Sequence, residues 1–384
     1  MTEQEIRFNV PDYSGSELAC LQESLSGGGS TSSNGQFSQK AVQILQAETG
    51  AAEVLLTTSC TAALELSAML LDLEPGDTVI VPSFTFTSSA LAFVRQGARI
   101  LFCDIEPRTL GPDPASVAAL LDDSVKAVVV VHYAGIACDI EGIREVLKDR
   151  PDVAIVEDNA HGLFGRWRGE PLGTLGRFAT LSFHDTKNVI CGEGGALVVD
   201  DAADVDRAWV HYDKGTDRQA FFLGQVDKYS WRDNGSSFGL ADPLAAILLA
   251  QLERRESIQA KRREVHERYA AVLAPYADEL GLGLPEVPDG AEPAYHLFHV
   301  LLPDASMRRG VMGDLKAKGI QTAFHYVPLH DSDGGERFAA RPTDCPVSSD
   351  VSARLLRLPF HNSLTMDECD RVAETLLASV AGRR

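Results

Sequence analysis

The chain has 384 residues, of which 45% are hydrophobic and 23% are charged, so its composition is that of a globular protein rather than a disordered one. Its 35 Lys and Arg against 55 Asp and Glu give a formal net charge of −20, which disfavours a nucleic-acid partner. The seven cysteines are scattered without a C-x-x-C pair, which argues against both a disulfide framework and a structural metal site.

Membrane and export signals are not evident in the sequence. The stretch from Thr2 to Arg7 lacks the basic and then apolar layout of a signal peptide. The most apolar run, residues 128–138, is too short to span a bilayer. We therefore expect a cytoplasmic protein that does not act in a membrane.

Residues 61–200 follow a Gly/Ser-rich loop at 24–35 and alternate between helical and strand patterns. Helices are expected at 61–73, 88–96 and 139–148, and strands at 78–81, 99–104, 126–131, 153–158, 178–183 and 195–199. The valine-rich run at 126–131 is typical of a strand that is buried on both faces. This alternation predicts an α/β fold with a doubly wound, mostly parallel sheet.

The remaining third of the chain has a different pattern. Asp242 and Pro243 predict the start of a long helix, with Asp as its cap, that runs to about Leu273 and ends near Pro275. Beyond it, expected strands (296–302 and 320–326) alternate with expected helices (306–318 and 366–380). We expect two domains: a large one over 1–240, and a long linking helix with a small α/β domain over 241–384.

Ligands of open α/β sheets bind beyond the carboxyl ends of the strands, and several polar motifs fall there. The run of small hydroxyl residues at 57–63 precedes a helix, and either caps it or offers its amides to a phosphate. The motifs G-x-G-x-x-G and G-x-x-x-x-G-K-[ST] are absent, which removes the usual dinucleotide and triphosphate ligands.

Three further residues fall at predicted strand ends. Asp158 could cap a helix or pair with a cationic ring nitrogen, and Lys187 could be merely exposed or form a Schiff base. Phe86 offers an aromatic face on which a flat ring could stack. Each signal is weak alone, but together they supply what pyridoxal phosphate requires: a phosphate cup, a stacking face, a carboxylate and a lysine.

Between residues 59 and 196 the chain contains six motifs in a fixed order, and the resemblance that they carry spans nearly the whole chain. The motifs are Ser-Cys-Thr-Ala-Ala, Pro-Ser-Phe-Thr-Phe, His-Tyr-Ala-Gly, Glu-Asp-Asn-Ala-His, Ser-Phe-His-Asp-Thr-Lys-Asn and Gly-Glu-Gly-Gly-Ala. In this order they resemble the sugar aminotransferases of the DegT/DnrJ/EryC1/StrS family, which are pyridoxal-phosphate enzymes of fold type I. The stretches 182–188, 224–233 and 324–330 look closest to the 4-aminotransferases that act on dTDP-4-oxo-6-deoxy-glucose.

The resemblance implies a role for each matching residue at the cofactor. Lys187 would attach to the cofactor and later move the proton, Asp158 would keep the pyridine nitrogen protonated, and His161 would lie by the phenolic oxygen. Phe86 would stack on the ring. The phosphate would be held by a set of small residues: the Thr61 and Ala62 amides and the Ser182 hydroxyl, beside Cys60, which stands where many members have Gly.

The resemblance also implies a homodimer with shared active sites. The partner subunit would complete the phosphate site from the segment 235–239, where this chain has Ser236 and Ser237 and many members carry an Asn. Two further groups of residues are candidates for substrate binding: the loop residues His325, Tyr326 and His330, which could equally be structural, and Lys214, Tyr229 and Arg232, which could reach the diphosphate of the neighbouring site.

The function expected from the resemblance is transfer of an amino group from L-glutamate to C4 of a dTDP-4-oxo-6-deoxyhexose. A C3 aminotransferase acting on a 3-oxo isomer is the alternative among enzymes, because the cofactor machinery would be the same. A cofactor-binding regulator without turnover is the alternative from another class. Lys187 argues against the dehydratase branch of the family, in which His replaces the lysine.

Overall fold

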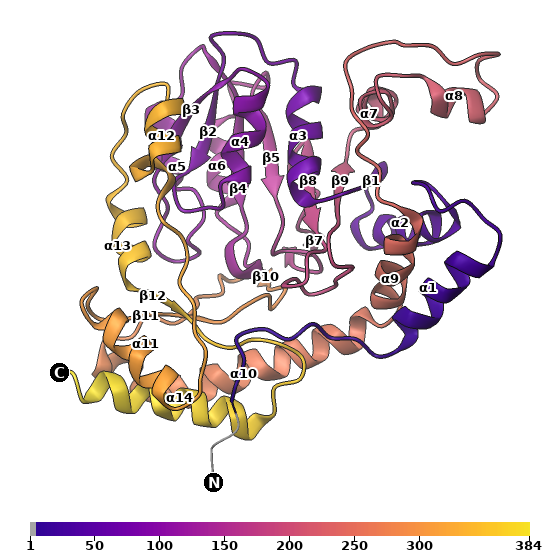
Figure 1. The fold of residues 1–384 in the computed structure, drawn as a ribbon. Coiled ribbons are helices and arrows are strands. Elements are labelled where there is room, and N and C mark those ends of the chain that lie inside the picture. The colour runs from indigo at the N-terminus through magenta and orange to yellow at the C-terminus, as the bar shows by residue number, and fades with distance from the viewer. Residues whose placement is uncertain (1–4) are drawn as a thin grey trace.

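The computed structural model describes residues 5–384, so part of the N-terminal stretch on which the signal-peptide expectation rests lies outside it. Its centre is a seven-stranded sheet with the order β1-β9-β8-β5-β4-β2-β3 (Figure 1). The strands are β1 (Glu53–Thr57), β2 (Thr78–Pro82), β3 (Arg99–Cys103), β4 (Val125–Val131), β5 (Ala154–Asp158), β8 (Phe178–Ser182) and β9 (Gly195–Val199). β9 runs antiparallel to β1 and β8, and the other neighbouring pairs are parallel. The predicted mostly parallel sheet is confirmed.

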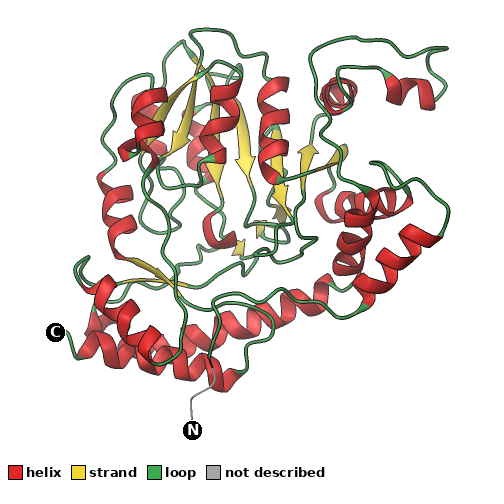
Figure 2. Cartoon of the chain, in the orientation of Figure 1, coloured by secondary structure: helices red, strands yellow, loops and turns green. Residues whose placement is uncertain are grey.

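Helices cover both faces of this sheet (Figure 2). One face packs against α3 (Cys60–Leu70), α4 (Ser88–Arg95) and α7 (Val205–Tyr212). The other packs against α2 (Gln36–Thr49), α5 (Pro114–Leu120), α6 (Ile140–Val146) and α9 (Asp242–Glu253).

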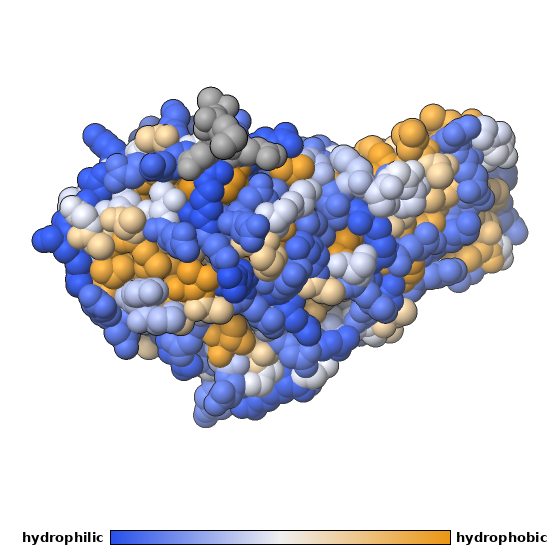
Figure 3. Space-filling view, turned by 90° about the horizontal axis from the view of Figure 1, so that it is seen from below, coloured by the Kyte–Doolittle hydropathy of each residue, from blue (hydrophilic) through white to orange (hydrophobic). Residues whose placement is uncertain are grey.

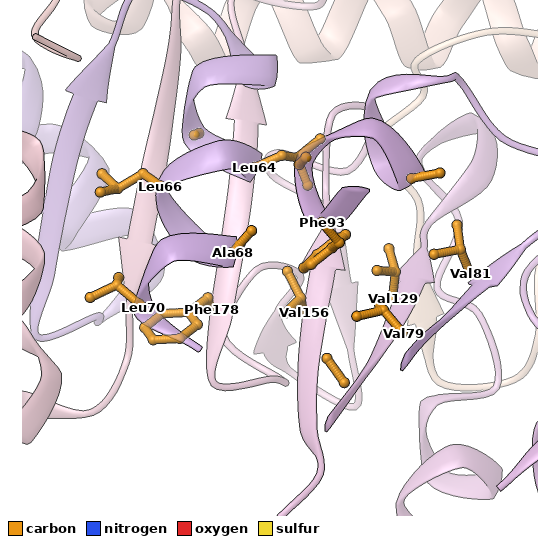
Figure 4. Close-up of a cluster of buried hydrophobic side chains, with 14 of the residues drawn as sticks. Leu64, Leu66, Ala68, Leu70, Val79, Val81, Phe93, Val129, Val156 and Phe178 are labelled. Carbon is orange, nitrogen blue, oxygen red and sulfur yellow. The ribbon is translucent and has the colours of Figure 1, made fainter. Parts of the chain in front are cut away.

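Strand residues alternate between these two layers because successive side chains of a strand point to opposite faces. Val79 and Val81 of β2 lie on the side of Phe93 of α4, as Figure 4 shows, whereas Ile80 packs on the side of α5 and α6. Each such fully buried aliphatic side chain stabilises the fold by about 1.5–3 kcal/mol relative to exposure. The sheet is therefore mainly apolar on both faces, and the polar residues that matter for the site, such as Asp158 and Ser182, lie at the carboxyl ends of its strands.

The other elements surround this core. The helices are α1 (Ser16–Ser26), α8 (Arg218–Phe222), α10 (Arg255–Leu280), α11 (Met307–Ala317), α12 (Asp333–Phe338), α13 (Pro346–Arg354) and α14 (Met366–Ala381), with short 3₁₀ turns η1 (Tyr133–Gly135), η2 (Ala202–Asp204) and η3 (Leu329–Asp331). Short strands form two small sheets: β10 (Ala291–Glu292) with β6 (Arg166–Trp167) and β7 (Glu170–Pro171), and β11 (His299–Leu301) with β12 (Leu355–Arg357).

A second hydrophobic cluster lies below the large sheet in Figure 1. It joins α10, α11 and α14 to the β11–β12 pair, and Ile6 from the beginning of the chain is buried in it. α9, by contrast, packs with α2 in the cluster of the large sheet. The division into domains over 1–240 and 241–384 stays a proposal. Residues on both sides of this boundary contribute to the cluster at the large sheet and to the second cluster.

Two expectations about residue 242 are wrong. The predicted single helix from 242 to about 273 is two helices, α9 and α10, which separate at Arg254, and α10 continues through Pro275 to Leu280. The Asp242 carboxylate does not cap its own helix. It accepts hydrogen bonds from the backbone N–H and the hydroxyl of Ser38, both at 2.8 Å, in the first turn of α2. The carboxylate of Asp242 thus binds a residue that is distant in sequence instead of the N–H groups at the start of its own helix.

Other boundaries also differ from the expected ones. The segment 320–326 is not a strand, because it makes only the isolated bridges Ile6–Ile320 and Ala323–Arg357 within the described structure. The expected strand at 296–302 shortens to β11, and the expected helix at 61–73 begins at Cys60 and ends at Leu70. None of the helices between residues 5 and 384 combines the length and hydrophobicity needed to cross a bilayer.

Candidate active site

A cavity of about 640 Å³ lies at the carboxyl edge of the parallel strands, between the large sheet and the C-terminal residues. It is lined by the start of α3, by the loops after β2, β5 and β8, and by four residues from the last third of the chain: His296, His325, Tyr326 and Arg357. A cavity of this size matches the range of small-molecule sites.

Lys187 projects into this cavity from the loop between β8 and β9. The loop turns tightly, since the Lys187 backbone N–H donates to the carbonyl of His184 at 2.8 Å. Burial lowers the pKa of Lys187 to about 8, although the Cys60 thiol and the Asp158 carboxylate oppose this shift. A larger fraction of the lysine is therefore the neutral amine near pH 7 than for an exposed lysine, which favours nucleophilic attack on a carbonyl carbon.

The residue after this lysine ties the loop to the C-terminal part of the chain. The side-chain amide of Asn188 donates to the carbonyl of Ala294 at 2.6 Å, and its oxygen lies 2.9 Å from Nδ1 of His296. Asn188 thus ties the loop that carries Lys187 to the residues on the far side of the cavity.

Two adjacent carboxylates end β5 and point to opposite faces of the strand. Asp158 lines the cavity and accepts hydrogen bonds from the Ser89 hydroxyl at 2.6 Å and from the Ala160 N–H at 3.2 Å. Glu157 is fully buried on the other side, where it accepts from Nε2 of His132 at 2.9 Å. Asp158 is therefore the carboxylate of β5 that can meet a ligand.

The helix start at α3 provides hydroxyl and amide groups to the cavity. Thr61 lines it and shares a hydrogen bond of 2.7 Å with the hydroxyl of Ser88, and Ser182 lines it from the end of β8. Ala62 lies just behind, with its amide donating to the Ser59 hydroxyl at 3.1 Å as part of the helix cap. The expected phosphate-binding roles of these residues remain predictions.

Cys60 occupies the tight junction between α3 and β9. Its thiol lies 3.6 Å from the Thr180 hydroxyl, and burial together with the nearby Asp158 raises the pKa of the thiol to about 12. A Cβ at Gly195 would come within 2.4 Å of the Cys60 backbone nitrogen, so this glycine allows the strand to approach the helix. A thiol held protonated in this way is a packing group rather than a nucleophile.

Aromatic rings form the remaining wall. Phe86 is 58% exposed at the mouth of the cavity, an unusual state for a phenylalanine, and so presents a free face for a planar ligand. His161 stacks on His296 with centroids 4.1 Å apart, and its buried Nδ1 has no hydrogen-bond partner in the described chain. His325 and Tyr326 line the same wall and stack on each other at 4.0 Å.

The other predicted substrate and partner-site residues lie outside this cavity. His330 bonds the Ser83 hydroxyl at 2.6 Å, which fastens η3 to the end of β2. The others are on or beside a segment that contains α8: Lys214 paired with Asp213, Arg232 near Asp217, Tyr229 against Phe221, and the exposed Ser236 and Ser237. Their roles remain predictions.

Several residues that line or support the cavity were not predicted from the sequence. Ser89 orients Asp158, His296 stacks on His161, and Arg357 brings a second cation. Arg357 had a usable signal, because it interrupts the apolar run Leu355-Leu356-Arg-Leu358. Ser89 and His296 had none, since nothing local distinguishes them from ordinary helix and loop residues.

These groups fit pyridoxal phosphate. Asp158 is available for the ring nitrogen, the unpartnered Nδ1 of His161 for the phenolic oxygen, Phe86 for the ring face and Lys187 for the aldehyde carbon. The bound cofactor would act as an electron sink for carbanions at the carbon carrying the amino group. In residues 5–384 no group of three or more His, Cys, Asp and Glu side chains is arranged to hold a metal ion.

The fold and cavity define a pyridoxal-phosphate-dependent aminotransferase of fold type I. The sequence matches the DegT/DnrJ/EryC1/StrS aminotransferase family over residues 12–377, and the chain belongs to this family.

Individual relatives agree with this assignment. The spore coat polysaccharide biosynthesis protein SpsC of Bacillus subtilis (strain 168) is 30% identical over 383 residues, which cover 98% of this chain and 97% of the relative. The aminotransferase TlmJ of Streptoalloteichus hindustanus is 30% identical, with a TM-score of 0.89 over 98% of this chain and 99% of that one. DesV of S. venezuelae is 28% identical, with a TM-score of 0.86 over 98% of each chain.

The buried histidines make the fold sensitive to acid. Burial lowers the pKa of each of five imidazoles, to about 4 for His266, about 3 for His299 and about 2 for His325, and well below 6.5 for His161 and His296. As the pH falls through 6.5, these histidines take up protons in the unfolded chain but not in the folded chain. Protonation therefore favours the unfolded chain, so the free energy of unfolding is highest above pH 6.5 and decreases below it.

We therefore expect the free energy of unfolding to fall steeply between pH 6.5 and pH 5. Each histidine contributes a slope of up to ~1.4 kcal/mol per pH unit. Urea titrations of the cofactor-free protein at several pH values measure how the free energy of unfolding depends on pH. The variant His266→Phe, changed at a residue outside the cavity, should have a smaller slope, because the contribution of one histidine is removed. A stability that stays constant over this range would contradict the expectation.

Proposed function

We propose that the protein transfers an amino group from L-glutamate to C4 of a dTDP-linked 4-oxo-6-deoxyhexose, giving a dTDP-4-amino-4,6-dideoxy sugar. The observation that carries the proposal is the meeting of Lys187 and Asp158 in a cavity whose wall includes His325 and Tyr326. These two belong to the stretch 324–330, one of those that resemble 4-aminotransferases. The family, which includes sugar aminotransferases, supports the reaction class.

The residues of the cavity have separate tasks in this reaction. Asp158 holds the ring nitrogen protonated, and Ser89 keeps its carboxylate turned toward the cavity. Lys187, as a neutral amine, would take the proton from the carbon that carries the amino group and return it to the carbon on the other side of that nitrogen. The histidine wall stays uncharged at neutral pH, so it stacks and accepts hydrogen bonds without repelling the cofactor's cations.

Two experiments test the acceptor. The enzyme is incubated with L-glutamate and either the 4-oxo or the 3-oxo isomer of the dTDP sugar, and the formation of 2-oxoglutarate is followed. We expect turnover of the 4-oxo sugar, and the H3–H4 coupling in the product's NMR spectrum then distinguishes the galacto from the gluco amine. Turnover of the 3-oxo isomer alone would support the C3 alternative, and no turnover of either sugar would support the regulator.

We further propose a cytoplasmic homodimer in which each site uses both chains. The segment around α8 projects from the body of the molecule in Figure 1 and exposes large apolar side chains, among them Phe222 (65% exposed) and Trp231 (85%). The same end of the molecule also exposes Leu18 and Leu25 of α1, and Figure 3 shows orange patches at this end as well as at the opposite one. Apolar surface of this extent favours association with a second copy.

Mixing two inactive variants tests the shared site. One chain carries Lys187→Ala, and the other carries Ser236→Asp and Ser237→Asp, which should repel the cofactor phosphate. In a mixed dimer one site holds both defects and the other holds neither, so an equimolar mixture should recover about a quarter of the wild-type activity. A mixture that stays inactive after confirmed subunit exchange, or an active monomer in size-exclusion chromatography, would contradict the shared site.

Cofactor affinity provides a second readout of the same proposal. If the partner completes the phosphate site, apparent affinity for pyridoxal phosphate should rise with protein concentration, because binding and association are linked. An affinity that is constant across the monomer–dimer transition would mean that each chain holds the phosphate unaided.

A further inference from the structure

Arg262 is a charged residue on the buried face of α10, and the reaction proposed above gives it no role. It is only 4% exposed and lies between Ile258 and Val265 on the apolar side of this helix, which runs below the large sheet in Figure 1. Burial lowers the pKa of the guanidinium to about 9, although Asp12 opposes the shift, so the cation persists at neutral pH. Burying a cation is costly, and the hydrogen bonds that Arg262 makes indicate what offsets this cost.

The guanidinium binds the backbone of one turn, residues 294–296. Its Nε donates to the carbonyl of Tyr295 at 2.9 Å, and one terminal nitrogen donates to the carbonyl of His296 at 2.5 Å. The other terminal nitrogen donates to Oδ1 of Asn362 at 3.2 Å. The rigid planar fork of arginine suits two consecutive carbonyls, whereas the single ammonium of a lysine would not fix both in the same way.

The backbone of this turn is strained. Tyr295 has a φ of +51°, and Ala134 in the turn opposite has a φ of +59°, both in the left-handed region that residues other than glycine rarely adopt. Two hydrogen bonds join the turns. The Ala294 N–H donates to the carbonyl of Gly135 at 2.8 Å, and the His296 N–H donates to the carbonyl of Ala134 at 3.2 Å. Strain of this kind persists only where several neighbours hold the backbone, and it is typical of functional sites.

The turn places the ring of His296 in the wall of the cavity. This ring stacks on His161, with centroids 4.1 Å apart and planes inclined by 22°. Its Nδ1 donates to Oδ1 of Asn188 at 2.9 Å, because the side-chain nitrogen of that amide already donates to the carbonyl of Ala294. Burial lowers the pKa of both histidines well below 6.5, so the stacked rings are neutral and do not repel each other.

His161 is the member of this stack that meets the cofactor in the proposed site. Its Nδ1 is buried and unpartnered within the described residues, and the phenolic oxygen of the cofactor is its expected partner. A hydrogen bond to a charged oxygen is strong only at a short distance and a favourable angle. The ring of His161 must therefore be held in one orientation, and the ring of His296 is the flat surface against which it lies.

We propose that Arg262 is a positioning residue of the cofactor site: it holds the turn 294–296, so that His296 keeps His161 turned toward the phenolic oxygen. The proposal rests on the proposed function only in placing His161 beside that oxygen, and it is independent of which sugar is the acceptor. Loss of Arg262 should therefore weaken cofactor binding through His161 and not by a separate route.

A double-mutant cycle tests this route. The affinity of the cofactor-free protein for pyridoxal phosphate is measured by absorbance titration. His161→Phe keeps a flat ring without the nitrogen and should weaken binding by at least ~10-fold, the scale of a hydrogen bond to a charged group. Arg262→Gln should also weaken it by at least ~10-fold in the wild-type background, but by less than about 3-fold when His161→Phe is already present, because the two changes remove the same interaction.

Variants of His296 test the stack without changing the arginine. His296→Phe retains a flat ring and should keep the affinity within about 3-fold of the wild type, whereas His296→Leu has no flat face and should lose as much as Arg262→Gln. Equal losses in the two variants, or no loss in either, would mean that stacking does not orient His161, and the proposal would be wrong.

Neighbouring changes separate positioning from general damage to the fold. Arg263→Gln removes the adjacent, exposed arginine, which stacks on the ring of Tyr295 at 5.3 Å, and it should leave the affinity unchanged. Arg262→Lys keeps the charge without the fork and should recover part of the affinity lost in Arg262→Gln. Urea titrations of each variant establish that the molecules titrated are folded.

The outcomes distinguish this proposal from those on which it rests. Losses that add in the cycle, or an unchanged affinity in folded Arg262→Gln, would overturn the positioning role. An unchanged affinity in His161→Phe would refute the expected place of His161, and the positioning role with it. A protein that gives the expected cycle but turns over neither dTDP sugar would refute the proposed acceptor and leave the role of Arg262 intact.

Discussion

Lys187→Ala should abolish turnover while leaving the fold intact. The side chain lines the cavity and burial lowers its pKa to about 8. In the proposed mechanism this lysine would both attach to the cofactor and transfer a proton. Loss of proton transfer alone is expected to reduce the rate by ~10²–10⁴-fold, and loss of the nucleophile adds to this. The measurements are steady-state turnover and the visible absorbance of covalently bound cofactor, which should vanish.

Chemical rescue makes this prediction specific. A small primary amine such as methylamine fits the space left by the lysine side chain and should restore part of the proton transfer in Lys187→Ala. Lys126→Ala, a change at a lysine of β4 paired with Asp77, should leave turnover unchanged. Catalysis near the wild-type rate in Lys187→Ala would refute the mechanism.

Asp158→Asn should preserve the shape of the site and lower the rate by at least ~10²-fold, the scale on which loss of one preorganised electrostatic partner slows an enzyme. An amide does not stabilise a protonated ring nitrogen, so the cofactor loses its strength as an electron sink. We expect weaker cofactor retention with covalent attachment still detectable by absorbance. A variant with full activity would mean that another group meets the ring nitrogen.

Glu157→Gln is the matched control, because the two carboxylates are adjacent in sequence and opposite in direction. Glu157 accepts hydrogen bonds from His132 and from the backbone N–H groups of Gly173, Leu175 and Gly176, at 2.6–2.9 Å. Breaking this buried network should destabilise the fold by ~3 kcal/mol or more. The rate per folded molecule should stay near that of the wild type, which chemical denaturation and active-site titration together measure.

The central sheet could be predicted from the sequence because its information is local. After Lys126, the run at 127–131 is hydrophobic on every residue, which is typical of a strand covered on both faces. Asp158 and Lys187 follow such strands, and parallel strands bring their carboxyl ends to one edge of a sheet. Strand order alone then brings these two residues, 29 positions apart in the sequence, into one cavity.

The helix boundaries around residue 242 could not be predicted in this way. Asp242 followed by Pro243 has the local pattern of a helix cap, yet its carboxylate binds Ser38, more than 200 residues earlier. Similarly, the segment 320–326 has the composition of a strand but lacks a neighbouring strand to pair with over its length. In both places local preference amounts to about 1 kcal/mol, and long-range partners decide the outcome.

The sequence by itself thus determined the family, the parallel sheet and the residues that follow its strands, since periodicity and strand ends are properties of short segments. Only the tertiary structure decided which face of β5 each carboxylate takes and which residues of the last third of the chain close the cavity. Arg357 lies 170 positions from Lys187, and the folding of β12 against the cavity makes its side chain part of the cavity lining rather than of the outer surface. Burial and pairing depend on all the neighbours of a side chain at once, and those neighbours are brought together only by the fold.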